Sequence, residues 1–353
     1  MHRVIQWATG TVGRHAIRAI CASSDLTLVG AYVYSPDKAG RDVGDICGIG
    51  SIGVRATNDK AAICALPADC VLYMSQGEDD PQGTIENICL LLASGKNVIS
   101  TALTALIYPR AAGEEVVARL QAACRAGNTS FHGTGIQPGW AAEVLPLTLS
   151  CLFRRIDSLL VREIFDYSTY PSARMLFDTM GFGKPPRPHP PLTLKPGEGA
   201  AFVAPLMLLA DALGANIERV IYACEFAVAA TALEITAGRI EVGTVAGKRY
   251  SFTAMIDGRP AICIEHVTRL GDEVAPGWPT GRGWHVAIDG APSMRLQSQI
   301  AVAGEDANDQ ACLGTAMHAV HAVRPVCAAA PGIRTFLDLP IIAGRGVLSG
   351  RPG

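Results

Sequence analysis

The sequence predicts an α/β protein: a doubly wound parallel sheet over residues 1–148, then an α+β domain with a largely antiparallel sheet over residues 149–310. Three observations predict it. The chain has 353 residues, enough for about two domains. Strand and helix patterns alternate up to about residue 135, which is typical of parallel sheets. After about residue 150, strand-like runs follow one another. We expect residues 311–353 to form a C-terminal helix and tail that pack back on the first domain.

The first element is a short apolar strand over residues 3–7, which passes directly into Ala8-Thr9-Gly10-Thr11-Val12-Gly13 and a helical pattern. Strand, glycine turn and helix in this order are typical of a dinucleotide-binding Rossmann domain. There, Gly10 would admit a diphosphate, Gly13 would let the helix pack closely, and the helix N-terminus would attract the phosphate. Ala8 replaces the first glycine of the G-x-G-x-x-G fingerprint, so the motif is degenerate. We predict cofactor contacts from Gly10, Thr11, Val12 and Gly13; the alternative is that these glycines serve close packing alone.

The later elements of the first domain supply further candidates. We expect strands over residues 26–35, 69–75, 97–101 and 129–135, and helices over residues 84–94 and 113–126. Ligands of open α/β sheets bind outside the carboxyl ends of the strands. This rule selects six more cofactor contacts: Ser35, Ser75, Gln76, Ser100, Thr101 and Gly135.

The end of the second strand bears on the choice of cofactor. An Asp or Glu there would bind the ribose 2′-hydroxyl of NAD, but this strand ends Tyr34-Ser35. Lys38 and Arg41 follow and suit the 2′-phosphate of NADP, whereas Asp37 does not. We therefore expect NADP, with NAD as the alternative if these are ordinary loop charges.

The second domain is predicted from consecutive strand patterns. A helix is expected over residues 199–215 and another over residues 312–323, before Pro325. Asp257-Gly258 and Asp289-Gly290 each predict a hairpin turn. The expected strands cover residues 158–166, 218–229, 233–242, 248–256, 261–269, 284–288 and 294–302.

Composition excludes several classes of protein. The formal net charge is −2, so there is no basic field for nucleic acid. The most apolar stretch, residues 200–210, is too short to span a membrane. Eleven cysteines have no C-x-x-C spacing, and the first residues resemble a strand rather than a signal peptide. We expect reduced cysteines, a cytoplasmic protein, a small-molecule substrate and no metal site.

Three residues are candidates for catalysis. Tyr167, beside Glu163, Asp166 and Tyr170, follows a strand and is the preferred proton donor; the alternative is a surface loop. His132 lies on the last strand of the first domain, where a core role is the alternative. Gln137 could bind a carboxamide or a substrate oxygen, or it could hold the Pro138-Gly139 turn.

Four segments in order carry a family resemblance: residues 4–13, 133–139, 180–183 and 331–335. Together they resemble the dihydrodipicolinate-reductase-like oxidoreductases, in particular the group that includes 2,4-diaminopentanoate dehydrogenase and the amine dehydrogenases. The resemblance implies a homodimer and hydride transfer from NAD(P)H to a C=O or C=N carbon. From this we expect an oxidoreductase that acts on a small, largely apolar substrate.

The chain also departs from that group. The resemblance implies an acidic residue just after the strand 97–101, which would handle ammonia and the iminium, but residues 100–106 contain no carboxylate. Gln137 stands where many relatives have Asn. We therefore favour reduction of a carbonyl or imine without ammonia. The alternatives are an amine dehydrogenase whose acid comes from elsewhere, such as Glu163 or Asp166, and a non-catalytic NADP-binding module.

Overall fold

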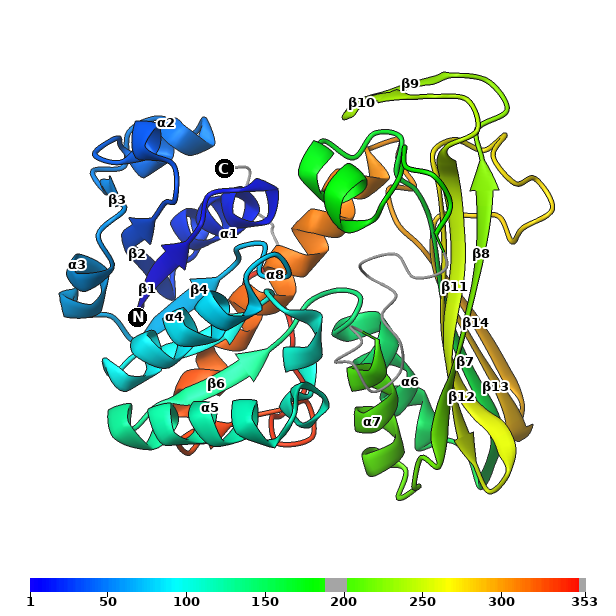
Figure 1. The fold of residues 1–353 in the computed structure, drawn as a ribbon. Coiled ribbons are helices and arrows are strands. Elements are labelled where there is room, and N and C mark those ends of the chain that lie inside the picture. The colour runs from blue at the N-terminus through cyan, green and yellow to red at the C-terminus, as the bar shows by residue number, and fades with distance from the viewer. Residues whose placement is uncertain (188–201, 349–353) are drawn as a thin grey trace. The chain divides into compact units, whose positions relative to one another are not determined.

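The computed structural model describes residues 1–187 and 202–348 (Figure 1). The chain forms two compact units. Unit 1 contains residues 1–136 and the described residues from Cys312 onward, and unit 2 contains residues 137–311. Each unit is built on its own sheet.

Unit 1 holds a seven-stranded sheet in which every pair is parallel. Its order is β3 (Ala56–Thr57), β2 (Leu26–Tyr32), β1 (His2–Trp7), β4 (Cys70–Tyr73), β5 (Asn97–Ser100), β6 (Ser130–Gly133) and β15 (Gly332–Ile333). The order 3-2-1-4-5-6 is that of the Rossmann fold, so the predicted doubly wound sheet is confirmed. The strand order reverses between β1 and β4, and ligands of such sheets bind beside that point.

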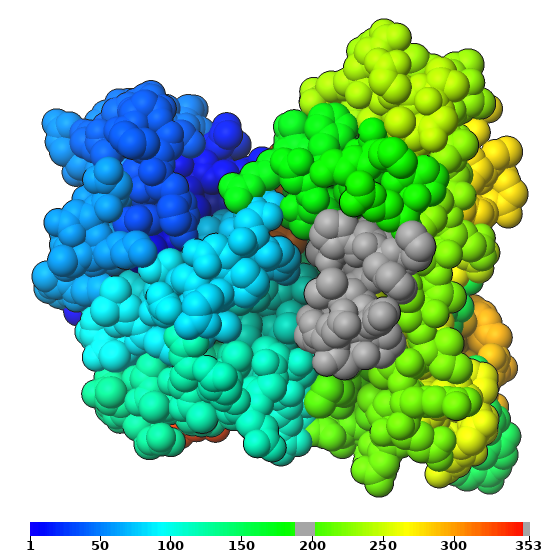
Figure 2. Space-filling model, in the orientation of Figure 1, coloured from blue at the N-terminus to red at the C-terminus, as the bar shows by residue number. Residues whose placement is uncertain are grey.

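Helices cover both faces of this sheet (Figure 1). They are α1 (Thr11–Ala22), α2 (Val43–Cys47), α3 (Lys60–Ala65), α4 (Pro81–Ala93), α5 (Glu114–Gly127) and α8 (Ala307–Ala328). Val4 of β1 packs in a cluster with α1 and α8, while its neighbour Ile5 packs with α3, α4 and α5. Successive residues of a strand therefore supply the two cores. Figure 2 shows α4 and α5, which pack against each other, on the surface of the unit.

The last helix is longer than expected. We predicted that it would end before Pro325, but α8 continues to Ala328 with Pro325 inside it. A proline removes one backbone hydrogen bond from a helix. Val323 and Val326 on either side are fully buried, so the packing of this helix on the sheet outweighs that loss.

Unit 2 holds a six-stranded sheet in the order β14 (Met294–Gln299), β13 (Gly283–Ala291), β7 (Arg155–Asp166), β12 (Arg259–Arg269), β11 (Val245–Ile256) and β8 (Arg219–Val228). The pair β7–β12 is parallel and the other pairs are antiparallel, which confirms a largely antiparallel sheet. The expected strand 233–242 is instead a small hairpin of β9 (Leu233–Ile235) and β10 (Gly238–Ile240).

Two helices, α6 (Leu145–Ser150) and α7 (Val203–Ala212), pack on one face of this sheet. The helix expected over residues 199–215 is thus shorter, and its residues 199–201 lie outside the described chain. Two π-helical turns, Trp140–Val144 and Arg174–Thr179, complete unit 2; three 3₁₀ turns, Pro36–Lys38, Thr104–Ile107 and Pro109–Ala112, belong to unit 1.

Both predicted hairpins form, and one of them has its turn at the predicted residues. Asp257 and Gly258 join β11 to β12 with φ of 51° and 71°, the two positive values that such a turn requires. The hairpin predicted from Asp289-Gly290 also forms, since β13 pairs antiparallel with β14, but its turn lies further along the chain because β13 runs through both residues to Ala291. The pairing with β7 is irregular there, and a side chain at Gly290 would overlap the backbone oxygen of Arg155. This glycine serves a close approach of two strands.

Candidate functional site

The turn between β1 and α1 has open space and free donors. Gly10 is the N-cap of α1, which has no side-chain cap and no acidic residue in its first turn. A Cβ added to Gly10 would meet no atom within 4 Å, whereas one added to Gly13 would overlap the backbone oxygen of Ala8. Gly13 therefore allows close packing, and Gly10 leaves room beside the N–H groups of Thr11 and Val12 at the positive end of the helix. These residues fit a diphosphate.

Ala8 explains how a degenerate fingerprint can still form this turn. Its φ is 75°, in the left-handed region that glycine adopts readily. The residue at the position of the missing glycine thus keeps a glycine-like backbone, at a cost of about 1–2 kcal/mol. The departure from the fingerprint changes the side chain and not the path of the chain.

The loop after β2 brings charged groups toward the glycine turn. The Lys38 Nζ lies 3.5 Å from the Thr9 Oγ1. The Ser35 hydroxyl donates to the Asp37 carboxylate, and this bond, with the charges of Lys38 and Arg41, lowers the pKa of Asp37. The loop therefore offers two cations and one exposed carboxylate.

Aromatic rings fix the ends of β1 and β4. Trp7 stacks on Tyr32, with ring centroids 3.9 Å apart, and on Tyr73, at 5.3 Å. The Trp7 Nε1 donates to the Tyr34 hydroxyl at 2.9 Å, which lies 3.3 Å from the Tyr73 hydroxyl. Burial raises the pKa of Tyr73, so this phenol stays protonated at neutral pH. Ser75 and Gln76 follow directly after this fixed strand end.

A carboxyl group from the loop after β4 reaches the loop after β5. The Glu78 Oε1 accepts hydrogen bonds from the Thr104 N–H at 3.0 Å and the Thr104 hydroxyl at 3.3 Å. Its Oε2 is buried and has no hydrogen-bond partner in the described chain. Burial raises the pKa of Glu78. The segment 100–106, which has no carboxylate of its own, therefore receives one from a neighbouring strand end; our sequence reasoning missed it, although Glu78 follows closely on Gln76.

The predicted contacts at the end of β5 are held by backbone bonds. The Ser100 hydroxyl accepts from the Ala102 N–H at 3.1 Å, and the Thr101 N–H donates to the Tyr73 carbonyl at 3.0 Å. Ser100 is almost fully buried.

His132 has the surroundings of a neutral core residue. It is fully buried on β6, its Nδ1 lies 2.7 Å from the Arg334 carbonyl oxygen, and its ring packs edge-on against Phe336. Burial lowers its pKa to about 4, so the ring is uncharged at pH 7. Two residues on, the Thr134 hydroxyl bonds to His318 of α8 at 2.8 Å, and Gly135 contacts the same histidine through its backbone.

Unit 2 begins with a turn that contains unsatisfied polar groups. Both side-chain polar atoms of Gln137 are buried without a partner in the described chain. Glu143 is fully buried, and its Oε2 accepts a 2.6 Å hydrogen bond from the Gly139 N–H. Burial raises the pKa of Glu143 well above the ordinary range. Glu143 thus holds the turn, burial favours its uncharged form, and the Gln137 amide has no partner in the described chain.

Tyr167 belongs to an array of aromatic rings within unit 2. Ring centroids are 6.0 Å apart for Trp140 and Trp284, 5.4 Å for Trp284 and Phe165, 6.3 Å for Phe165 and Tyr167, and 5.5 Å for Tyr167 and Tyr170. Rings at such spacings pack favourably and present a largely apolar surface.

The two acids that we considered as replacements have partners within unit 2. The Glu163 Oε2 accepts from the Trp284 Nε1 at 2.9 Å, and its Oε1 lies 3.3 Å from the His266 Nδ1. The Asp166 Oδ1 accepts from the N–H groups of Ser168 and Gly271. Both carboxylates therefore have structural partners.

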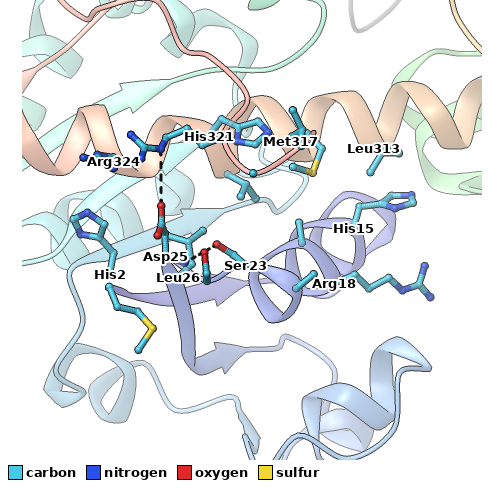
Figure 3. A pocket seen from close by; sticks show the side chains of 18 residues that line it. His2, His15, Arg18, Ser23, Asp25, Leu26, Leu313, Met317, His321 and Arg324 are labelled. Carbon is cyan, nitrogen blue, oxygen red and sulfur yellow. Dashed lines mark hydrogen bonds and ion pairs between the residues drawn. The ribbon is translucent and has the colours of Figure 1, made fainter. Parts of the chain in front are cut away.

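A separate cavity of 990 Å³ lies between α1 and α8 in unit 1. Figure 3 shows side chains that line it, among them His15 and Arg18 of α1 and Met317, His321 and Arg324 of α8. None of the predicted cofactor or catalytic residues lines this cavity. In the described residues, no group of His, Cys, Asp and Glu is placed to hold a metal, and no helix is long and apolar enough to cross a membrane.

Comparisons with known proteins match most of the chain to one group of enzymes. The family model of the dihydrodipicolinate reductase N-terminus matches residues 1–106, and that of the 2,4-diaminopentanoate dehydrogenase C-terminal domain matches residues 141–346. The chain is 32% identical over 348 residues to an amine dehydrogenase from Streptomyces virginiae, covering 97% of each protein. It is 26% identical over 280 residues to a 2,4-diaminopentanoate dehydrogenase from Acetoanaerobium sticklandii, covering 78% of this chain and 74% of the relative.

A solved structure shares the fold. An amine dehydrogenase from Mycobacterium smegmatis superposes with a TM-score of 0.80 at 20% identity, over 98% of this chain and 97% of the other. A dehydrogenase from Thermotoga maritima has a TM-score of 0.57 at 13% identity, over 95% and 92% of the two chains.

Proposed function

The chain belongs to the family of amine and 2,4-diaminopentanoate dehydrogenases and is an NAD(P)-dependent oxidoreductase; from this premise we propose that it interconverts a small, largely apolar carbonyl compound and the corresponding amine. One observation carries the proposal. The open, uncapped glycine turn lies at the reversal point of a Rossmann sheet, in a chain that matches an amine dehydrogenase over its full length. When bound, the nicotinamide cofactor supplies or accepts hydride.

The cofactor that we propose is NADP. Support comes from Lys38, whose ammonium lies beside Thr9 of the glycine turn, and from the nearby Arg41. No acidic residue ends β2, where it would bind a ribose 2′-hydroxyl. Asp37 opposes a phosphate, so the preference rests on two cations against one carboxylate.

The substrate class follows from unit 2. The aromatic array that includes Trp140, Phe165 and Tyr167 suits a small apolar group. The unpartnered amide of Gln137 can bind either the nicotinamide carboxamide or a substrate oxygen. For reduction of a carbonyl without ammonia, the Tyr167 phenol remains the proton donor that we propose.

A second candidate reaction is reduction of a carbonyl or imine without ammonia. The observation that favours it is the segment 100–106, which contains no carboxylate. This reaction would proceed equally well with and without ammonium, whereas the formation of an amine from a carbonyl compound requires ammonium. The dependence on ammonium therefore distinguishes the two reactions.

We also propose a cytoplasmic homodimer. The sheet of unit 2 has one face on α6 and α7; around a hollow of 870 Å³ the opposite face carries both apolar residues, such as Leu160 and Cys263, and charged residues, such as Arg162 and Glu265. Such a face suits a second copy of the chain. Sedimentation equilibrium should give twice the chain mass of 37.1 kDa, and a monomer at micromolar concentration would contradict this.

The function is tested with purified protein. NADPH and NADH are titrated while nicotinamide fluorescence is followed, and NADPH oxidation is then measured with a panel of small ketones, with and without ammonium chloride. We expect tighter binding of NADPH and oxidation that requires ammonium. Binding without turnover on any carbonyl, imine or enone would point to a non-catalytic NADP-binding module.

A further inference from the structure

Glu78 lies at the edge of unit 1 where ligands of this fold bind. It follows β4, the strand beside which the sheet order reverses, and it contacts the loop after the neighbouring β5. β4 and β5 are paired in register up to Tyr73 and Ser100, so their carboxyl ends meet at one edge. That edge is the crevice in which open α/β sheets hold their ligands.

The two oxygens of this carboxyl group have different surroundings. Two hydrogen bonds from Thr104 fix Oε1, and hence the orientation of the whole group. Oε2 is buried and has no partner in the described chain. A buried polar atom without a partner costs about 1–3 kcal/mol, and most such atoms in folded proteins are satisfied. The oriented, unsatisfied oxygen therefore indicates a ligand group that binds there.

The charges around Glu78 favour its protonated form. Burial and the negative charge of Asp79 raise its pKa, while the hydrogen bonds from Thr104 and the backbone of Leu103 act in the opposite direction. In the described chain, no ion pair to a Lys, Arg or His neutralises this carboxylate. Burial therefore favours the protonated acid, and a cationic ligand would stabilise the ionised form.

We propose that Glu78 is the catalytic acid of this enzyme, with Oε2 in contact with the substrate during the exchange between carbonyl and amine. This inference rests on the proposed function. It also accounts for the absence of a carboxylate in residues 100–106, because Glu78 places one against Thr104 within that segment.

The proposed step balances as follows. Ammonia adds to the carbonyl carbon and gives a neutral carbinolamine. The Glu78 acid donates its proton to the carbinolamine hydroxyl, the C–O bond breaks, water leaves, and the nitrogen lone pair forms the C=N bond. The iminium and the Glu78 carboxylate then form an ion pair, and the bound nicotinamide cofactor would supply the hydride that reduces the iminium carbon. A new ammonium ion returns a proton to Glu78 and becomes the next ammonia.

Glu143 provides a matched control. It is also a buried carboxyl group with one unpartnered oxygen, and burial raises its pKa too. Its other oxygen binds the Gly139 N–H, which is a structural role. In either position, glutamine keeps an oxygen that can accept the existing hydrogen bond and loses only the ionisable proton.

The experiment compares wild type, Glu78→Gln and Glu143→Gln. Melting temperature and NADPH binding, measured by fluorescence, should be the same for all three. The kcat of ammonium-dependent ketone reduction should fall by about 10²- to 10⁴-fold in Glu78→Gln, the range expected for the loss of a general acid. Its kcat should also lose the pH dependence seen in wild type. Glu143→Gln should keep kcat and the pH profile within about twofold, because it retains its bond to Gly139.

A second readout does not depend on turnover. Infrared difference spectra of the complex with NADP⁺ should show a protonated carboxyl band that is absent in Glu78→Gln. Adding a small primary ammonium compound, such as isopropylammonium, should remove this Glu78 band in wild type by forming the ion pair. The carboxyl band of Glu143, which is missing in Glu143→Gln, should remain in wild type.

The outcomes separate the two levels of the proposal. Wild type that binds neither coenzyme overturns the proposed function and this inference with it. Wild type that turns over substrate while Glu78→Gln keeps the same kcat and pH profile overturns the inference alone. A loss of kcat confined to Glu143→Gln also overturns it and assigns the acid to unit 2.

Discussion

Substitution of Gly10 by alanine separates the binding of the cofactor from the stability of the fold. The φ of Gly10 is −71°, which alanine adopts without strain, and an added Cβ would meet nothing within 4 Å. Alanine at an N-cap is less favourable than glycine by several tenths of a kcal/mol, and the loss of glycine's freedom in the unfolded chain offsets this by about 0.4–1 kcal/mol. We therefore expect the free energy of unfolding to change by less than about 0.5 kcal/mol.

Binding should respond differently, because the methyl group would occupy the space of the diphosphate. Displacing the diphosphate weakens one or two charge-assisted hydrogen bonds from the helix N-terminus, each worth about 1.5–3 kcal/mol. A loss of about 2–4 kcal/mol raises the Kd for NADPH roughly 30- to 900-fold. Fluorescence titration of Gly10→Ala and wild type measures this, and thermal melting verifies the fold. Equal NADPH affinity in the two proteins would refute our reading of the turn.

Three further predictions concern neighbouring groups and the core of unit 2. Replacing both Lys38 and Arg41 by alanine should weaken NADPH about 10- to 100-fold and leave NADH nearly unchanged, as measured by the same titration; an equal loss for both coenzymes would contradict the NADP assignment. Ala8→Gly should raise the free energy of unfolding by up to about 1 kcal/mol, because glycine relieves the positive φ; destabilisation in a denaturant titration would show that the alanine is unstrained. Burial lowers the pKa of Lys248 to about 8, so between about pH 8 and 10.5 the unfolded chain binds a proton at this residue that the folded protein does not, and the contribution of Lys248 to stability should rise with pH by up to about 3 kcal/mol. Lys248→Met should lack this rise, and parallel stability curves for the two proteins would count against it.

Local sequence patterns predict the elements of this fold well where neighbouring residues along the chain determine the structure. The run from β1 through Gly10 to α1 combines a strand, a turn with room for a ligand and a helix, and the sheet order follows from the alternation after it. Sequence patterns fail to predict the ends of helices and the positions of turns where contacts with residues distant in the chain determine them. Pro325 does not end α8 because the valines on both sides are buried, and Gly290 does not turn the chain because Arg155 lies against it.

The residues of the candidate site also fall into those that the sequence predicts and those that it does not. The glycine turn and the loop with Lys38 are visible in the sequence because their roles depend on neighbours along the chain. Glu78 is not, since its role depends on Thr104, 26 residues away, and on the pairing of β4 with β5. His132 looks catalytic as an isolated histidine, but the carbonyl of Arg334, 202 residues away, gives it a structural partner.

A crystal structure of the protein with NADP⁺ tests the central claim most directly. We predict that the diphosphate oxygens accept hydrogen bonds from the N–H groups of Thr11 and Val12, over the space beside Gly10. A coenzyme bound instead in the cavity between α1 and α8, with the glycine turn unchanged and empty, would contradict the account.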